Sequence, residues 1–382
     1  MSFLHPIFTI PFIFMLVAWY KDLNHEISDK DKKNLIIFFA IVLIIGAGFR
    51  YYVGADYPVY ASLYNSAFPI YTTYQDIIDK ALFRPNSMEI EWIFVLINKI
   101  LFDFGMPFYA LTFVIAMISI SLQFSTFYKF SYSPFFSILF YFIPLYFFAD
   151  AGQIRQGVGT AVCIFSLRYI ISRNLWKFLI CIFIALGFHK TSIIFLPAYW
   201  IVLLPLNSKQ WTFILIGCVI TSPLELYNVF GNAFASLSPQ DVSNAYVGYL
   251  DDKYYGKDME SGIDDIIKIA LVIVVYALDK KGAEKAHYYE YFRNLGFFGF
   301  CLFYILRGNQ IFATRLPAVY VVMMGYFVVP GIMASVSKEV QNFLRLGFTT
   351  YLIAMYLIFS NLNGNRGGFI ITKYKNVLWS PT

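Results

Sequence analysis

The chain has 382 residues, of which 59% are hydrophobic, 20% aromatic and only 14% charged, with a formal net charge of +6. A soluble domain carries about a quarter charged residues, so a soluble core could not bury this much apolar surface, and part of the solvent must be lipid. Lysine and arginine stand at the ends of apolar runs and form no basic stripe. This argues against a nucleic-acid partner and is typical of membrane orientation signals.

Apolar runs long enough to cross a bilayer, about 17–25 residues each, follow one another along the chain. They are 3–20, 34–50, 107–128, 134–150, 154–172, 174–188, 190–205, 211–230, 263–279, 290–306, 313–334 and 343–361. The pattern predicts an all-α, polytopic integral membrane protein with about 12 transmembrane helices, within a range of about 10–13, in a single domain over 1–382. The first run lacks a basic start and a small-residue cleavage site, so we expect a membrane helix there and not a signal peptide.

The segment 88–105, MEIEWIFVLINKILFDFG, has an apolar helical stripe, but its clean apolar stretch is too short to cross. It carries Glu89, Glu91, Lys99 and Asp103. If it lies in the interface as an amphipathic helix near 88–104, all the basic clusters fall on one side of the membrane. We therefore expect an interfacial helix, both termini outside, and long external loops at about 50–106 and 231–262, where the activity should reside.

A few arginines stand apart from the basic clusters, at or just inside the predicted outer ends of helices. They are Arg50, Arg155, Arg307 and Arg315. An arginine in mid-membrane costs about 2.5–3.5 kcal/mol on insertion scales, and less near the interface, where each of these could simply snorkel. If the four converge on one face, their planar forks would instead bind the phosphate oxygens of a polyanion.

The stretch 146–162, YFFADAGQIRQGVGTAV, interrupts two apolar helices joined with almost no loop. Its polar residues are Asp150, Gln153, Arg155 and Gln156, and its glycines are Gly152, Gly157 and Gly159. The glycines would let another backbone or a ligand approach closely. The alternative is a tight helical hairpin in which Asp150 and Arg155 pair with each other.

Two further stretches carry titratable groups beside predicted outer turns. His189 interrupts an apolar run in 184–197, IALGFHKTSIIFLP, and is either structural, a proton acceptor or a phosphate ligand. In 48–60, GFRYYVGADYPVY, Asp56 follows Arg50 just outside the predicted membrane. Asp56 could orient Arg50, accept a proton from a hydroxyl or bind a metal, and the tyrosine faces suit sugar rings as well as the interface.

Several familiar signatures are absent from the sequence. There is no GxxxxGK[ST], no GxGxxG after a strand, no HExxH and no GxSxG. The cysteines lie inside apolar runs without zinc or CxxC spacing, at Cys163, Cys181, Cys218 and Cys301. We therefore predict no cofactor, no resident metal and no soluble nucleotide-binding fold.

The elements RYYVGADYPVY, MEIEWIFVLINKI, IRQGVG and GFHKTS, in this order, resemble the EpsG-like family of polysaccharide polymerases, the Wzy type. The resemblance covers most of residues 40–205 and is looser at ATRLPAVY and TKYKNVLW; Gly159 stands where the family often has alanine. It implies a GT-C-like glycosyltransferase, multi-pass in the bacterial inner membrane, with its active site facing the periplasm. The implied donor and acceptor are undecaprenyl-pyrophosphate-linked glycan repeats of O-antigen, capsule or exopolysaccharide, and a chain-length regulator is left open as a further partner.

The resemblance also implies which residues act. Carried over by motif are Arg50, Asp56, Tyr60, Arg155, Gln156, His189 and Ser192, with Arg315 as a weaker match. His189 or Asp56 would be the catalytic base, with His189 preferred because a histidine pKa lies nearer neutral pH. The arginines, Arg307 among them, would hold the pyrophosphate, while Tyr60, Gln156 and Ser192 would support the site.

Other functions remain open from the sequence. A flippase for the same lipid-linked units would line a cavity through the membrane with its arginines, instead of clustering them at outer ends. An O-antigen ligase would share the donor and differ only in its acceptor. An envelope acyltransferase would keep a catalytic histidine but would not need so many arginines.

Overall fold

The computed structural model describes residues 5–54, 56–66, 68–82, 90–225, 259, 262–361 and 374–379. In this part of the chain the regular structure is helical, apart from one isolated bridge between Arg50 and Asn376, so the predicted all-α class is confirmed there. The chain divides into two compact units. The first comprises Met1–Tyr169, Trp176–His189 and Ser337–Thr382, and the second Ile170–Leu175 and Lys190–Val336. The single domain expected over 1–382 stays a prediction beside this division.

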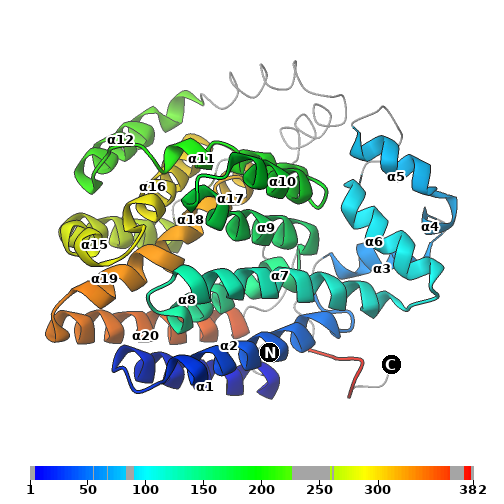
Figure 1. Ribbon diagram of the computed structural model, residues 1–382, viewed down its shortest axis with the longest axis horizontal. Helices are drawn as coiled ribbons and strands as arrows, with labels where there is room; N and C mark the ends of the chain where they lie inside the picture. The colour runs from blue at the N-terminus through cyan, green and yellow to red at the C-terminus, as the bar shows by residue number, and fades with distance from the viewer. Residues whose placement is uncertain are drawn as a thin grey trace. The chain divides into compact units, whose positions relative to one another are not determined.

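The first unit gathers helices from the beginning, middle and end of the chain (Figure 1). They are α1 (Pro6–Leu23), α2 (Asp29–Gly48), α3 (Tyr57–Asn65), α4 (Phe68–Tyr71), α5 (Tyr74–Ala81), α6 (Trp92–Asp103), α7 (Phe108–Phe130), α8 (Pro134–Phe140), the π-helical η1 (Tyr141–Asp150), α9 (Ile154–Ile171) as far as Tyr169, α10 (Leu175–Leu186) from Trp176, and α20 (Lys338–Asn361). Helix α2 packs along α7, α1 packs against α8, and α20 packs against η1. The short helices α3 and α6 contact α7, and α4 and α5 pack on α6.

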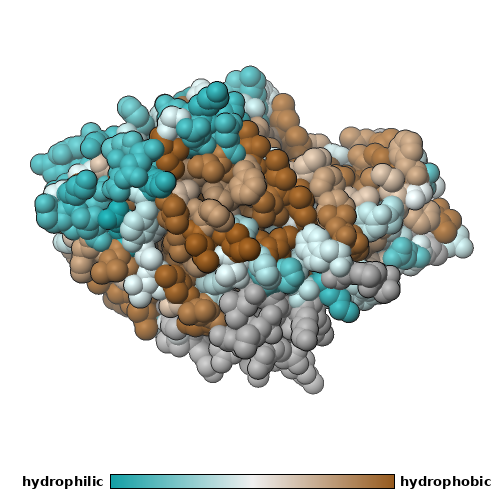
Figure 2. All heavy atoms as spheres, turned by 90° about the horizontal axis from the view of Figure 1, so that it is seen from below, coloured by the Kyte–Doolittle hydropathy of each residue, from teal (hydrophilic) through white to brown (hydrophobic). Residues whose placement is uncertain are grey.

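Local signals in the sequence account for where the first helices begin. The Ser28 hydroxyl accepts a hydrogen bond from the Asp31 N–H and so caps α2, whose first turn also carries acidic residues that favour the helix dipole. In α1, the His5 ring nitrogen accepts from the Ile7 N–H. Both helices expose apolar side chains, such as Phe14 and Phe38. Figure 2 shows hydrophobic residues over much of the surface it views, as expected where lipid replaces water.

The helices of the first unit sort basic residues and motif residues to opposite ends. At one end, the Thr112 hydroxyl near the start of α7 donates to the Gly48 carbonyl at the end of α2. At the other, Arg168 near the end of α9 donates to Ser125 and Thr126 near the end of α7. Arg50 follows α2 and therefore lies at the end away from Arg168. This separation agrees with the distribution of charge expected from the sequence.

The second unit is centred on one helix. Its elements are η2 (Lys190–Phe195), α11 (Ala198–Ile201), α12 (Ser208–Thr221), η3 (Ser222–Leu224), α15 (Ile263–Lys285), α16 (Tyr289–Ile305), α17 (Gln310–Arg315), α18 (Ala318–Met323), η4 (Met324–Val328) and α19 (Val329–Ser335). Helix α16 packs against α12, α18 and η4, and α15 packs against α19. A Cβ on Gly299 of α16 would lie 2.6 Å from the backbone nitrogen of Val321, so glycine permits the close approach of α18.

Helices long and apolar enough to cross a membrane occur in both units. Among the described residues they are Pro6–Leu23, Phe108–Phe130 and Gln310–Ser335, with shorter apolar helices at Pro134–Asp150 and Leu175–Leu186. These helices indicate a membrane protein. The total of about 12 crossings stays a prediction.

Two of the predicted segments can be compared directly with the helices. The run 190–205 was expected to cross, but it forms η2 and the single turn α11, because Pro197 lacks the N–H that a continuous helix requires. Helix α6 has 12 residues; at that length it spans about 18 Å, against a hydrocarbon core of about 30 Å. It is too short to cross, as expected, while its place in the interface stays a prediction. Of the predicted external loop 231–262, all but Met259 and Gly262 lies outside the described residues.

Candidate functional site

The stretches 48–60 and 146–162 meet at a glycine in the first unit. Gly54 has a φ of +103°, and a Cβ atom on it would lie 2.1 Å from the carbonyl oxygen of Ala151. Only glycine accommodates both this backbone conformation and this approach. The start of α3 is thereby placed against the turn that leads into α9.

Arg155, the second residue of α9, contacts side chains from two other elements. Its Nη1 donates to Oε2 of Glu91 at 2.5 Å, and its Nε donates to the Tyr60 hydroxyl at 3.3 Å. The guanidinium carbon lies 5.6 Å from the Tyr60 ring centroid and 5.9 Å from that of Phe94. These contacts hold the guanidinium group through Nε and Nη1.

The Nη2 group of the Arg155 guanidinium is uncommitted within the described part of the chain. Its Nη1 and Nε bonds are accounted for above, and Nη2 donates to no described residue. The side chain is 26% exposed, whereas that of Glu91 is 9% exposed. Arg155 can therefore present an N–H group to an anion while Glu91 and Tyr60 keep the group in place.

The stretch 184–197 is hydrogen-bonded to the segment that carries Glu91. The Gly187 carbonyl accepts from the N–H groups of Ile93 and Phe94, at 2.8 and 3.2 Å, and so satisfies the first free donors of α6. A Cβ on Gly187 would lie 2.5 Å from Cγ1 of Ile93, so the two segments of the chain are in close contact at this glycine. His189 follows two residues later and is 8% exposed.

Arg50 is almost completely buried, at 1% exposed. Its Nε donates to the Val53 carbonyl at 3.1 Å, its Nη1 donates to the Ala47 carbonyl, and its guanidinium carbon lies 5.7 Å from the Tyr57 ring centroid. Its Nη2 is buried with no hydrogen-bond partner among the described residues. The first two bonds stabilise the chain reversal between the end of α2 and Gly54.

The segment 374–379 braces the same end of α2. The Tyr374 hydroxyl donates to the Gly46 carbonyl at 2.8 Å, and the Asn376 side-chain amide donates to that hydroxyl at 2.8 Å. The Val377 N–H donates to the Phe49 carbonyl, and Asn376 forms the bridge with Arg50. A late stretch of the chain therefore supports the residues of the first motif.

Three other predicted site residues belong to the same unit as Arg155. Asp56 is half-buried at the start of α3, where its carbonyl accepts from the Tyr60 N–H at 3.0 Å. Gln156 is half-buried on α9. Burial raises the pKa of the Tyr60 hydroxyl, and the neighbouring Arg155 charge opposes that rise only in part. Tyr60 therefore keeps its proton at neutral pH and can donate it to a further acceptor.

The remaining predicted residues lie in the second unit. The Asp265 carboxylate accepts hydrogen bonds from Nη1 and Nη2 of Arg307, at 2.8 and 2.9 Å, and from the Tyr304 hydroxyl at 3.1 Å. Ser192 is buried in η2, and Arg315 ends α17, half-exposed. The structure thus brings together Tyr60 and Arg155 by direct contact, with Arg50, Asp56, Gln156 and His189 in the same unit.

The alternative pairing of Asp150 with Arg155 is wrong. Asp150 accepts from the Tyr141 hydroxyl at 2.6 Å, and the partner of Arg155 is Glu91. Asp150 ends the π-helical segment η1 and is buried, whereas Arg155 starts the next helix on the side of α3 and α6. The turn between the two residues gives their side chains different neighbours.

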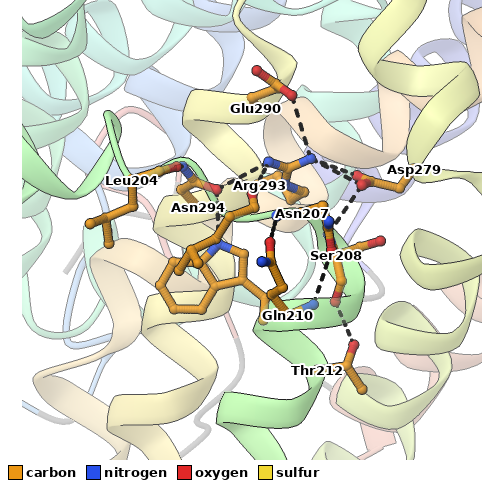
Figure 3. Close-up of polar contacts among 11 residues, drawn as sticks. Leu204, Asn207, Ser208, Gln210, Thr212, Asp279, Glu290, Arg293 and Asn294 are labelled. Atoms are coloured by element: carbon orange, nitrogen blue, oxygen red, sulfur yellow. Dashed lines mark hydrogen bonds and ion pairs between the residues drawn. The ribbon is translucent and has the colours of Figure 1, made fainter.

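Two polar centres are not predicted by the sequence. Glu91 is there only a charge in a predicted interfacial helix, and its place in an apolar stripe is the available signal. Figure 3 shows the second centre, in which Arg293 donates from Nη1 to both oxygens of Asp279 at 3.0 Å. Asn294 donates to the carbonyls of Val202 and Leu204, at 3.2 and 2.8 Å. This centre fastens the chain before α12 to α16, and its signal was the pair RN within the run 290–306.

Within the described residues, no group of three or more His, Cys, Asp or Glu side chains is placed to hold a metal ion. A family model described as EpsG family matches residues 33–376. This match takes in all four motifs and the late stretch TKYKN. No curated protein and no solved structure matches the chain.

Proposed function

The chain belongs to the EpsG family, and from this premise we propose that it polymerises undecaprenyl-pyrophosphate-linked oligosaccharide repeats on the periplasmic face of the inner membrane. Membership in the family suggests a membrane polysaccharide polymerase, and the apolar helices suit such a protein. The donor, the membrane face and a GT-C-like architecture are parts of the proposal. The product would be O-antigen, capsule or exopolysaccharide.

The observation that carries this proposal is the convergence of three motifs on Arg155. Tyr60 from 48–60 bonds Nε and Glu91 from 88–105 bonds Nη1, while Nη2 donates to none of the described residues. A planar fork with a free donor suits a phosphate oxygen. A lipid diphosphate is the leaving group of the proposed reaction, so the cation would stand where negative charge develops.

The proposed reaction transfers the growing glycan between two lipid carriers. The bond between the anomeric carbon and the diphosphate oxygen breaks, and the electron pair leaves with the lipid diphosphate. A hydroxyl at the non-reducing end of the next lipid-linked repeat forms the new bond and loses its proton to a base. His189 serves as that base in preference to Asp56, because an imidazole accepts a proton near neutral pH. A direct displacement of this kind inverts the anomeric centre.

The other predicted residues have supporting parts in this proposal. Arg50 is buried and bonded to carbonyls, so it acts by holding the first motif and by its charge. The Tyr60 hydroxyl and Gln156 orient groups around the substrate. Ser192, Arg307 and Arg315 stay predictions from the sequence as site residues, and Arg307 gives two donors to Asp265.

A reconstituted assay tests the proposed function. The purified protein in lipid nanodiscs is given the lipid-linked repeat of its host, and products are resolved as single units or as a ladder. Wild type should form the ladder, and Arg155→Ala and His189→Ala should leave single units. Arg168→Ala is the matched control, because Arg168 lies on the same helix and stacks on Phe165 at 3.5 Å, away from the motifs.

Three outcomes would contradict the proposal. A ladder of normal length from both Arg155→Ala and His189→Ala would remove the proposed site. A wild-type protein that moved lipid-linked units across a vesicle membrane without joining them would be a flippase. Transfer of a preformed glycan to a different acceptor, again without a ladder, would identify a ligase.

A further inference from the structure

Glu91 is a buried carboxylate that has no step of its own in the reaction proposed above. It is 7% exposed and stands immediately before α6. The Glu91 side chain does not cap the helix that follows it. The Gly187 carbonyl accepts from the N–H groups of Ile93 and Phe94, so these donors are satisfied without the carboxylate.

The Glu91 side chain is therefore available to Arg155. The carboxylate oxygen lies 2.5 Å from Nη1, while Tyr60 occupies Nε. An arginine side chain has many rotamers, and two bonds, one at Nε and one at Nη1, hold the guanidinium in a single orientation. Tyr60 and Glu91 therefore occupy Nε and Nη1, and Nη2 keeps its donors for a ligand.

We propose that Glu91 is a positioning residue that fixes the Arg155 fork for the departing diphosphate; this rests on the function proposed above. Its negative charge also stands close to the place where the diphosphate binds, and like charges disfavour binding. Glu91 therefore has two opposed effects on catalysis. It weakens ground-state binding of the donor, and it keeps the cation in the orientation that the transition state requires.

Separate measurement of kcat and KM tests this role. Glu91→Gln keeps the shape and one carbonyl acceptor but removes the charge, so kcat should fall about tenfold or more, with KM for the lipid-linked donor unchanged or lower. The control is Asp103→Asn on the same helix, which breaks the exposed pair with Lys99 and should leave both constants unchanged. Both variants are compared per mole of folded protein recovered in nanodiscs.

A charge exchange tests whether the ion pair serves only the fold. In the double variant Glu91→Arg with Arg155→Glu, the ion pair is restored with its sign reversed. Folded protein should be recovered at the wild-type level, and turnover should stay at least a hundredfold below wild type, because the cation no longer stands at the end of α9. If Glu91→Gln is not recovered folded, this double variant carries the test.

Distinct outcomes overturn this inference and the proposed function. Wild-type turnover in the exchanged pair, or an unchanged kcat per folded Glu91→Gln enzyme, shows a pair that only stabilises the fold. A higher KM with unchanged kcat shows a carboxylate that only aids binding. A wild-type protein that forms no ladder removes the proposed polymerase activity, and this inference falls with it.

Discussion

At the scale of single residues, charge and burial distinguish arginines that the sequence treats alike. Arg50 is buried and donates to main-chain carbonyls, and Arg307 gives two donors to Asp265. Arg50 and Arg155 each have an Nη2 without a bond to a described residue, but the Arg155 side chain is 26% exposed whereas Arg50 is buried. The difference depends on which neighbours the fold supplies, so it defines Arg155 as the residue to substitute first.

Replacing Arg155 with lysine tests the geometry of the fork while keeping the charge. A lysine ammonium cannot bond Glu91 and Tyr60 in one plane and still reach a phosphate oxygen. We expect Arg155→Lys to lower kcat about a hundredfold with the protein still recovered folded. The measurement is the rate of ladder formation, and wild-type rates would show that only the charge matters.

At the scale of elements, close approaches at glycine hold the motifs together. Gly54 against Ala151 joins the start of α3 to the turn before α9, and Gly187 against Ile93 joins the end of α10 to the start of α6. Hydrogen bonds from 374–379 hold the end of α2 in turn. The site therefore depends on connections between elements that carry no catalytic group.

Gly54→Ala should disrupt the close approach of the stretch 48–60 to the stretch 146–162. The left-handed backbone alone costs a non-glycine residue about 1–3 kcal/mol, and the added Cβ would also overlap the Ala151 carbonyl. We expect lower thermal stability in detergent and loss of the ladder. Gly105→Ala is the control, because Gly105 also has a positive φ, of +67°, but open space around its Cβ position. Equal losses in both variants would mean that backbone strain, not the contact with Ala151, is the cause.

Removing the Tyr374 hydroxyl should loosen the brace on α2. Tyr374→Phe deletes the bond to the Gly46 carbonyl and the acceptor of the Asn376 amide, at about 0.5–1.5 kcal/mol for each bond. Thermal unfolding in detergent should report a lower midpoint, and Asn376→Ala should behave alike. Lys375→Ala is the matched control, because its side chain is exposed and only its carbonyl is used. A midpoint equal to that of the control would show that the segment does not support α2.

At the scale of the whole molecule, the two ends of the helices in the first unit differ in charge. Arg168 contacts the end of α7, while the end of α2 contacts the start of α7. From the positive-inside rule we expect the basic end in the cytosol and the motifs outside. This orientation is what the proposed periplasmic reaction requires.

Cysteine labelling in intact spheroplasts tests the orientation. With Cys163, Cys181, Cys218 and Cys301 replaced by alanine, a cysteine at Ser66, which is exposed after α3, should react with a membrane-impermeant maleimide. A cysteine at Lys33, exposed at the start of α2, should react only after permeabilisation. The reverse pattern would put the motifs in the cytosol and contradict the proposed periplasmic site. Each variant is first shown to form the ladder, so that labelling reports an active protein.

The sequence by itself determined the helical, membrane-embedded class, most helix positions and the motifs of the family, because these depend on local hydropathy and on short runs of residues. It did not predict that Glu91 is the partner of Arg155, that 190–205 breaks into short helices, or that 374–379 braces Arg50. Only the tertiary structure decided those points. Side chains far apart along the chain choose partners by distance and direction, and these follow from how helices pack and not from any local pattern.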